Sequence, residues 1–218
     1  GLAADLKRAA DKQLWIPAHG RYGYFVHGKG PKAGHLETHQ EGAGLTYSLL
    51  FGMADDRQAR DILNHFHNQP YGMTAVWPHF ARFSDKRPGR HNVLVWPQMN
   101  AYWALAALRR GRRDVFQWEL ENLTELFYRT SPNIREIYDS VRGVPNGGIQ
   151  SGRQWKATEH QTWGATGYLR LVYSGLFGMQ FEEDGIRFQP YLPRTWGSCR
   201  LEGLAYRKAR LTISVTGS

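Results

Sequence analysis

One stretch near the middle of the chain joins a polar, aromatic loop to the start of a helix: His91-Asn92-Val93-Leu94-Val95-Trp96-Pro97-Gln98-Met99-Asn100-Ala101-Tyr102-Trp103. Pro97 suits the first turn of a helix, because the backbone N–H that proline lacks would have no partner there. Residues 101–108 then continue in good helix formers. His91 and Asn92 place hydrogen-bonding groups beside the flat ring of Trp96, which favours a sugar site at the mouth of a helix, although an ordinary loop before a helix has the same pattern.

Helical periodicity recurs over the first 176 residues. Apolar residues at helical spacing predict helices over 2–14, 36–52, 55–67, 96–110, 114–128 and 158–174. Short connections predict two antiparallel helical hairpins, the first from 36–52 and 55–67 and the second from 96–110 and 114–128. Long polar loops over 70–90 and 130–156 each precede a helix, so we expect the loops to gather at one end of a bundle or barrel.

The periodicity changes after residue 176. Residues 178–190 alternate about Asp184-Gly185, which is a strong hairpin signal, and 201–204 and 209–215 are typical of further strands. We therefore expect a helical domain over residues 1–176 and the start of a β-sandwich domain over residues 177–218. Since each of these domains is expected to be partial, we also expect the chain to be a fragment of a longer protein.

Composition narrows the class of protein. With 41% hydrophobic and 13% aromatic residues the chain can bury a core, and no apolar run is long enough for a membrane span. The net charge of +9 is scattered along the chain and does not predict a nucleic-acid partner. Lys86, Arg87 and Arg90 could face an anionic substrate, or could simply be solvated.

The lone Cys199 excludes an intrachain disulfide, and neither a cofactor nor a metal is expected. Oligomeric state is left open, and localisation also, with a cytoplasmic and a periplasmic or secreted protein both compatible.

Several motifs occur in an order that resembles a known family. They are His-Asn-x-x-x-Trp-Pro at 91–97, Glu-x-Tyr-Asp at 136–139, the helix start Trp-Gly-Ala at 163–165, Gly-Leu-Phe-Gly-Met at 175–179 and Asp-Gly-Ile-Arg-Phe-Gln-Pro-Tyr-Leu-Pro at 184–193. Over about residues 10–195 this order resembles the six-hairpin, (α/α)6-barrel glycoside hydrolases, and above all the processing α-glucosidase and mannosylglycerate hydrolase group. The resemblance implies a mainly α fold, the C-terminal part of such a barrel followed by the start of a β-sandwich.

The resemblance also implies a set of site residues. Glu136 matches the general base of the group, and the sugar site is implied to include His91, Asn92, Trp96 and Trp163. Glu37, on the predicted helix over 36–52, and Trp77, in the loop over 70–90, are further candidates for contact with the sugar. This chain departs from the pattern in a longer loop over 143–161, which makes Glu159 a rival for the base. It also has Val93 where many members have glycine.

Glycoside hydrolysis requires two carboxyl groups, roughly 6.5–9.5 Å apart when the configuration of the sugar is inverted. In the group that the chain resembles, the acid is an Asp upstream of the segment matched here, so the resemblance implies an inverting glycosidase whose acid lies outside this chain. Two alternatives stay open. One is a six-hairpin phosphorylase or rhamnosidase-like enzyme, and the other is a carbohydrate-binding barrel without a working carboxyl pair.

Overall fold

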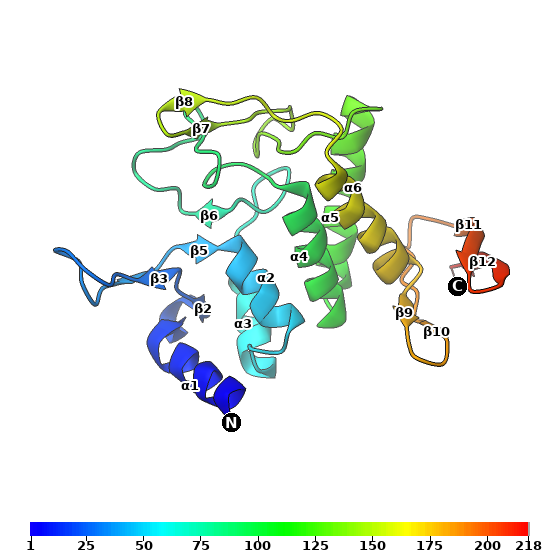
Figure 1. The fold of residues 1–218 in the computed structure, drawn as a ribbon, viewed down its shortest axis with the longest axis horizontal. Helices are drawn as coiled ribbons and strands as arrows, with labels where there is room; N and C mark the ends of the chain where they lie inside the picture. Colours follow the sequence, from blue (N-terminus) through cyan, green and yellow to red (C-terminus); the bar gives the residue numbers. More distant parts are fainter. Residues whose placement is uncertain (218) are drawn as a thin grey trace.

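The computed structural model describes residues 1–217, in which α-helices form the centre and short hairpins and loops surround them (Figure 1). The helices are α1 (Leu2–Leu14), η1 (Pro17–His19), α2 (Gly42–Leu50), α3 (Asp56–His65), α4 (Pro97–Arg109), α5 (Arg113–Thr130), α6 (Thr162–Arg170) and η2 (Leu171–Leu176). The strands form antiparallel pairs: β1 (Trp15–Ile16) with β2 (Arg21–Tyr22), β3 (Phe25–Val26) with β4 (Leu36–Glu37), β5 (Gln40–Glu41) with β6 (Val76–Trp77), β7 (Ile149–Gln150) with β8 (Arg153–Gln154), β9 (Met179–Phe181) with β10 (Ile186–Phe188), and β11 (Ser198–Tyr206) with β12 (Ala209–Thr216).

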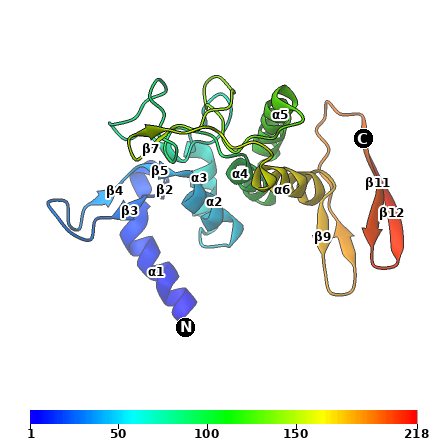
Figure 2. The ribbon, with the colours of Figure 1, turned by 45° about the horizontal axis from the view of Figure 1, so that its top comes forward.

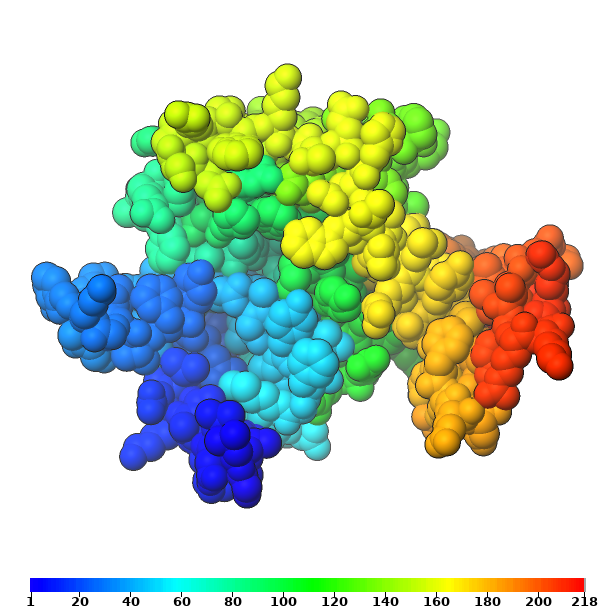
Figure 3. All heavy atoms as spheres, in the orientation of Figure 1, coloured from blue at the N-terminus to red at the C-terminus, as the bar shows by residue number. Residues whose placement is uncertain are grey.

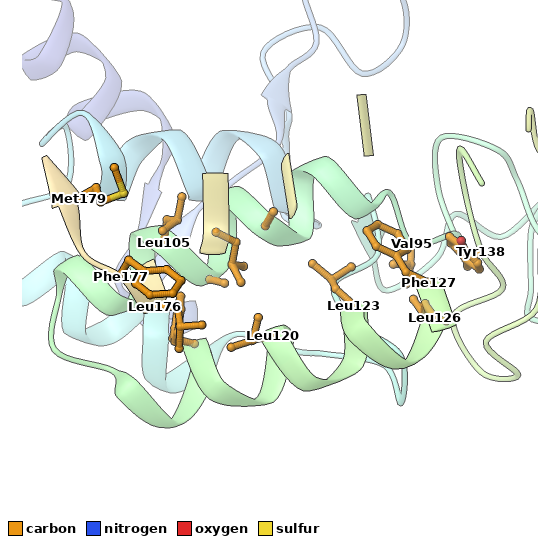
Figure 4. Packing of buried hydrophobic residues seen from close by; sticks show 14 residues of the cluster. Val95, Leu105, Leu120, Leu123, Leu126, Phe127, Tyr138, Leu176, Phe177 and Met179 are labelled. Atoms are coloured by element: carbon orange, nitrogen blue, oxygen red, sulfur yellow. The ribbon is translucent and has the colours of Figure 1, made fainter. Parts of the chain in front are cut away.

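The larger core lies between α4, α5 and η2. Leu105 of α4, Leu120 and Leu123 of α5 and Leu176 of η2 are all buried there, and the cluster extends to Tyr138 in the loop before α6 (Figure 4). A second core joins α2, α3 and α4, since side chains from all three helices are buried against one another around Trp103. Helix α4 therefore contributes to both cores, and the site stretch leads directly into it.

Local signals account for the helix starts. Asp55 and Gln58 form a capping box at α3, in which each side chain accepts a hydrogen bond from the other residue's backbone N–H. Pro97 occupies the first turn of α4 after the extended residue Trp96, as the sequence predicts. The predicted helices over 2–14, 55–67, 96–110 and 114–128 are thus confirmed to within a few residues at each end.

Two predicted helices begin later than the sequence indicates. In the predicted helix over 36–52, Leu36–Glu37 form strand β4 and Gln40–Glu41 form strand β5, because they find backbone partners in β3 and β6. Helix α2 begins only at Gly42. In the predicted helix over 158–174, Gln161 is the N-cap of α6 and its side chain accepts a hydrogen bond from the N–H of Trp163. From Leu171 the helix continues in the wider π geometry of η2.

The C-terminal segment forms two hairpins far from α1, with β9–β10 next to α6 and β11–β12 beyond it (Figure 2). The hairpin β9–β10 turns at Asp184-Gly185, as predicted, and β11–β12 is longer. Within residues 1–217 each of these strands pairs only with its hairpin partner, so the predicted start of a β-sandwich is not confirmed. The last residue of the predicted domain, Ser218, lies outside the described residues.

The long loops over 70–90 and 130–156 cover one end of the helices, where β6, β7 and β8 lie (Figure 1). In the space-filling view, the yellow atoms of the segment before α6 lie against the green and teal atoms of the segment before α4 (Figure 3). Across the part of the chain that the structure describes, no helix is both long and apolar enough to cross a membrane.

Candidate active site

The loops before α4 and α6 are joined by backbone hydrogen bonds. Val95 and Tyr138 each donate to the carbonyl of the other, at 3.0 and 3.1 Å, and the N–H of Arg90 donates to the carbonyl of Ile149 at 3.0 Å. Within the segment before α4, the N–H of Val76 in β6 donates to the carbonyl of Asn92. Segments far apart in the sequence thus form one layer over the helix ends, where the sequence predicts the site.

Glu136 lies in this layer with its two carboxylate oxygens in different surroundings. Oε2 accepts hydrogen bonds from Arg90 Nη2 at 2.6 Å and from the hydroxyl and the backbone N–H of Thr158 at 2.9 and 3.3 Å. Oε1 accepts no hydrogen bond from any described residue. Since Oε1 is not one of the buried side-chain atoms that lack a hydrogen-bond partner, it is accessible to solvent. One oxygen is anchored and the other is free to hold a water molecule or a sugar hydroxyl.

The ionisation of Glu136 depends on the same contacts. Burial raises the pKa of this carboxyl, but the hydrogen bonds from Arg90 and Thr158 outweigh burial and leave the pKa below its usual value. The side chain is only 12% exposed. Glu136 is therefore a partly desolvated carboxylate that is kept ionised by donors on one of its oxygens.

Arg90 is the residue that connects Glu136 to the surrounding loops. Its side chain is 9% exposed, and Nη1 donates to the carbonyl of Gly147 at 2.9 Å while Nη2 reaches Glu136. The guanidinium carbon lies 5.5 Å from the ring centre of Trp96 and 5.6 Å from that of Trp155. The charge of Arg90 is therefore paired inside the protein and gives no support to an anionic substrate.

Three predicted site residues form an aromatic group beside Arg90. Trp96 donates from Nε1 to the carbonyl of Arg90 at 3.1 Å, and the ring of His91 stacks on the indole with centres 5.0 Å apart at 16°. Trp163, at the start of α6, meets Trp96 edge to face with centres 6.5 Å apart. His91 and Trp163 are exposed, so they present ring surface beside Trp96 to which a sugar face can stack.

Asn92 belongs to the same loop, but it is only 2% exposed. Its side-chain oxygen accepts a hydrogen bond from the N–H of Phe80 at 3.2 Å, and its Nδ2 is buried without a hydrogen-bond partner among the described residues. The described contacts thus hold the loop over 70–90 against the site stretch. The role of Asn92 in sugar binding stays a prediction.

Glu37 and Trp77 lie apart from the contacts of Glu136. Glu37 is on strand β4 instead of the predicted helix, and its carboxylate pairs with His27 at 2.7 Å, Lys32 at 2.9 Å and His39 at 3.3 Å. The hydrogen bonds from His27 and Lys32 lower the pKa of Glu37 to about 2. The role of Glu37 in sugar binding stays a prediction.

Trp77 stacks on His67 with ring centres 3.8 Å apart and meets the ring of His79 edge to face. The described contacts therefore place it in a separate aromatic group, next to strand β5. Its role in sugar binding also stays a prediction.

The rival carboxylate, Glu159, is 53% exposed and pairs with Arg135. It lines a surface cavity of about 510 Å³ together with Trp155 and Thr158. Unlike Glu136, it is largely solvated. Among the residues that the structure describes, no group of three or more His, Cys, Asp or Glu side chains could hold a metal ion.

Sequence reasoning misses two residues in this group. Thr158 is read as the start of a helix, and Trp155 only as part of a long loop. Both act through partners distant in the chain, since Thr158 donates to Glu136 across 22 positions and the ring of Trp155 lies against Arg90 of the loop before α4. The position of Arg90 directly before His91 is the one sequence signal that could have included it in the site.

Comparison with known proteins places these features in a family. The sequence model of the mannosylglycerate hydrolase MGH1-like glycoside hydrolase domain matches residues 1–164, and that of the C-terminal domain of glycosyl hydrolase family 65 matches residues 179–218. A comparison with curated proteins gives no match.

Solved structures share the fold. A crystal structure of GH63 mannosylglycerate hydrolase from Thermus thermophilus in complex with glucose matches with a TM-score of 0.54 and 21% identity, over 75% of this chain and 35% of that chain. The complex of the same enzyme with Tris and D-glycerate matches with a TM-score of 0.54 and 19% identity, over the same shares. An uncharacterized conserved protein from Thermus thermophilus matches with a TM-score of 0.52 and 19% identity, over 75% of this chain and 36% of that chain.

The chain thus spans about a third of the length of these structures. The family match, by contrast, covers most of this chain, from residue 1 to residue 164. The chain belongs to the mannosylglycerate hydrolase MGH1-like glycoside hydrolase domain family.

Proposed function

We propose that the protein containing this chain is a glycoside hydrolase in which Glu136 is the general base. The observation that carries the proposal is the difference between the two oxygens of Glu136. Oε2 is held by Arg90 and Thr158, while Oε1 is free and accessible. A general base in hydrolysis must orient a water molecule and accept its proton, and a fixed, ionised carboxylate with one free oxygen meets both needs.

The surroundings of Glu136 suit a sugar. His91 and Trp163 offer exposed ring surface on either side of a contact with Trp96, which itself lies against Arg90, the partner of Glu136, and the imidazole of His91 adds a hydrogen-bonding group. We propose that the reaction inverts the anomeric carbon and that the acid, an Asp, comes from a part of the protein outside this chain, as the resemblance implies.

The substrate is proposed as a small glycoside. The matching GH63 structures are complexes with glucose and with D-glycerate, which supports a hexose joined to a small polar group. Arg90 gives no support to an anionic substrate, because its charge is paired with Glu136. Lys86 and Arg87 remain exposed in the loop before it. Hexosyl-glycerates and neutral hexosides are therefore the first substrates to compare.

The domain division is also a proposal. We propose a partial barrel over residues 1–176 and the start of a C-terminal β-sandwich domain over residues 177–218. Matches to two different family models, over 1–164 and 179–218, support a division near residue 177. The two hairpins after η2 support strands as the structure of the second part.

Substitution of the two carboxylates tests the function. In the complete protein, Glu136→Gln should lower kcat by about a hundredfold or more, because the amide cannot accept the proton. Glu159→Gln is the matched control and should have a much smaller effect, since Glu159 is half exposed and paired with Arg135. Circular dichroism checks that both variants are folded, and proton NMR of fresh product identifies the anomer. An inactive Glu159→Gln beside an active Glu136→Gln would show that the base is misassigned.

A further inference from the structure

Resting on the proposed function, we infer that Arg90 is a positioning residue of the hydrolytic reaction, which holds Glu136 so that Oε2 is engaged and Oε1 is left free for the attacking water. Arg90 does not touch the sugar in this proposal. It acts through Glu136, and its geometry suits that role better than substrate binding.

The guanidinium makes two directed contacts from one planar group. Nη1 donates to the carbonyl of Gly147 at 2.9 Å, and Nη2 donates to Glu136 Oε2 at 2.6 Å. Gly147 lies in the loop between Glu136 and α6, so the two contacts fix the carboxylate relative to the loop that follows it. A lysine has one point of charge in place of this rigid fork and would have to leave one of the two contacts.

The plane of Arg90 is itself fixed by aromatic rings. Trp96 and Trp155 each lie within 6 Å of the guanidinium carbon, at 5.5 and 5.6 Å, and Trp96 also donates to the backbone carbonyl of Arg90. A cation held over indole rings and shielded from water gains from the ring electrostatics and loses little freedom on pairing. The ring contacts therefore reduce the number of positions that Arg90, and with it Glu136, can adopt.

Thr158 completes the hold from the other side. Its hydroxyl and N–H both donate to Oε2, and its carbonyl accepts the backbone N–H of Glu136 at 2.9 Å. If the carboxylate turned by 180° about its Cγ–Cδ bond, Oε1 would take the place of Oε2 in the contacts with Arg90 and Thr158. One oxygen is thus always engaged and one always free.

The charged groups near Glu136 set the expected pH behaviour. Arg90 and His91 come from the loop before α4, and burial and Arg90 lower the pKa of His91. Arg135, the chain neighbour of Glu136, pairs with Glu159. Burial of Glu136 is opposed by the hydrogen bonds from Arg90 and Thr158, so removing Arg90 should raise the pKa of Glu136. A base works only when ionised, so the acid limb of activity should move to higher pH.

The test compares Arg90→Met and Arg90→Lys in the complete protein by kcat and KM across pH. For Arg90→Met we expect the acid limb of kcat/KM to move up by about one pH unit or more, as for a carboxylate that loses an adjacent cation. Arg90→Lys keeps the charge, so its acid limb should move less, while kcat should fall about tenfold or more from loss of alignment. In both variants KM should change little, because the sugar does not contact Arg90.

Arg112→Met is the matched control. Arg112 also pairs with a carboxylate, Asp114, and donates to a carbonyl, that of Leu63, but it lies between α4 and α5, at the end of the helices away from the loops. For the Arg112→Met variant, kcat and the acid limb of kcat/KM should match those of the wild type. If Arg90→Met does not fold by circular dichroism, Arg90→Lys decides alone. A folded Arg90 variant with wild-type acid limb and kcat would overturn the inference.

A double variant separates positioning from a merely structural role. If Arg90 acts through Glu136, then Arg90→Lys should not lower the residual rate of Glu136→Gln any further, whereas two independent effects would multiply. Independent effects would overturn the inference. The two proposals also fail differently. Wild-type activity in Glu136→Gln would contradict both proposals, the base and the positioning role. An inactive Glu136→Gln together with fully active Arg90 variants would contradict only the positioning role.

Discussion

At the scale of single residues, Glu119 is a buried carboxyl that the proposed chemistry does not use. It lies on α5 with 0% exposure, and both of its oxygens lack a hydrogen-bond partner among residues 1–217. Nδ2 of Asn122, one turn further along α5, is also buried without a partner there. Burial raises the pKa of Glu119 well above its usual value, because an unpaired charge is costly away from water. The side chain is therefore expected to be neutral in the folded protein at mildly acidic pH.

The pH dependence of stability follows from this raised pKa. The folded state holds the proton more tightly than the unfolded state, so the stabilising difference is fully present below about pH 4.3 and is lost as the pH rises through the folded-state pKa. Between about pH 4.3 and the folded-state pKa, the free energy of unfolding of the wild type should fall by up to about 1.4 kcal/mol per pH unit relative to that of Glu119→Gln, which has no proton to release. Thermal unfolding of the complete protein at several pH values measures the difference.

The control for Glu119 is Glu121→Gln on the same helix, since the side chain of Glu121 is exposed and accepts a hydrogen bond from Gln117. Its unfolding temperature should follow that of the wild type at every pH. A constant difference between wild type and Glu119→Gln across the range from mildly acidic to neutral pH would contradict the raised pKa.

At the scale of elements, the packing of α6 on α4 brings Trp163 beside Trp96. The two helices approach closely at Gly167, where an added Cβ would lie 2.7 Å from Cα of Gln98. Since the neighbour is backbone, α6 would have to move away. At Gly164, three residues earlier in α6, the nearest atom to an added Cβ is a methyl carbon of Ile134 at 3.3 Å, which can shift. The close approach of the helices at Gly167 thus determines where α6 places Trp163.

We predict that Gly167→Ala destabilises the protein by about 1–3 kcal/mol through overpacking against α4. Gly164→Ala is the matched control, and it should be neutral or stabilising by up to about 1 kcal/mol, because alanine favours helix. Chemical unfolding measures both variants. Gly167→Ala should also weaken sugar binding by moving Trp163, so a variant of unchanged stability and unchanged KM would contradict the packing.

At the scale of the whole molecule, many large apolar side chains of this chain are exposed. Leu2 on α1 is 76% exposed, Phe51 after α2 is 80% exposed and Tyr128 on α5 is 80% exposed. None of the α1 residues is buried, although this helix has apolar side chains at helical spacing. Apolar surface of this kind promotes association with other surfaces.

The chain of 218 residues produced alone is therefore expected to self-associate and to bind a hydrophobic dye such as ANS. Light scattering after size exclusion measures the association. Leu2→Lys and Phe51→Lys should reduce it, while Gln13→Lys, which adds the same charge at an exposed polar position, should reduce it less. A monomer that binds no dye and unfolds in one sharp transition would contradict the expectation.

Features with a local physical cause could be predicted from the amino-acid sequence. The helical spacing of apolar residues and the proline at the start of α4 act within a few residues, and they predicted α1, α3, α4 and α5. The capping box at Asp55, found in the structure, is a local feature of the same kind. The Asp184-Gly185 turn predicted the hairpin β9–β10 for the same reason. The order of the motifs, which pointed to the family, is also a property of the sequence.

The remaining features follow from contacts between distant segments, which appear only in the folded chain. Gln40 and Glu41 form a strand since β5 pairs Gln40 with Trp77, a partner in a distant segment that no local pattern reveals. The charge of Arg90 is paired because the fold brings Glu136 to it across 46 positions. Thr158, which the sequence predicts as the start of a helix, likewise donates a hydrogen bond to the carboxylate of Glu136. Backbone pairing and charge pairing between segments each outweigh the modest local preferences of the residues involved, and neither can be read from neighbours in the chain.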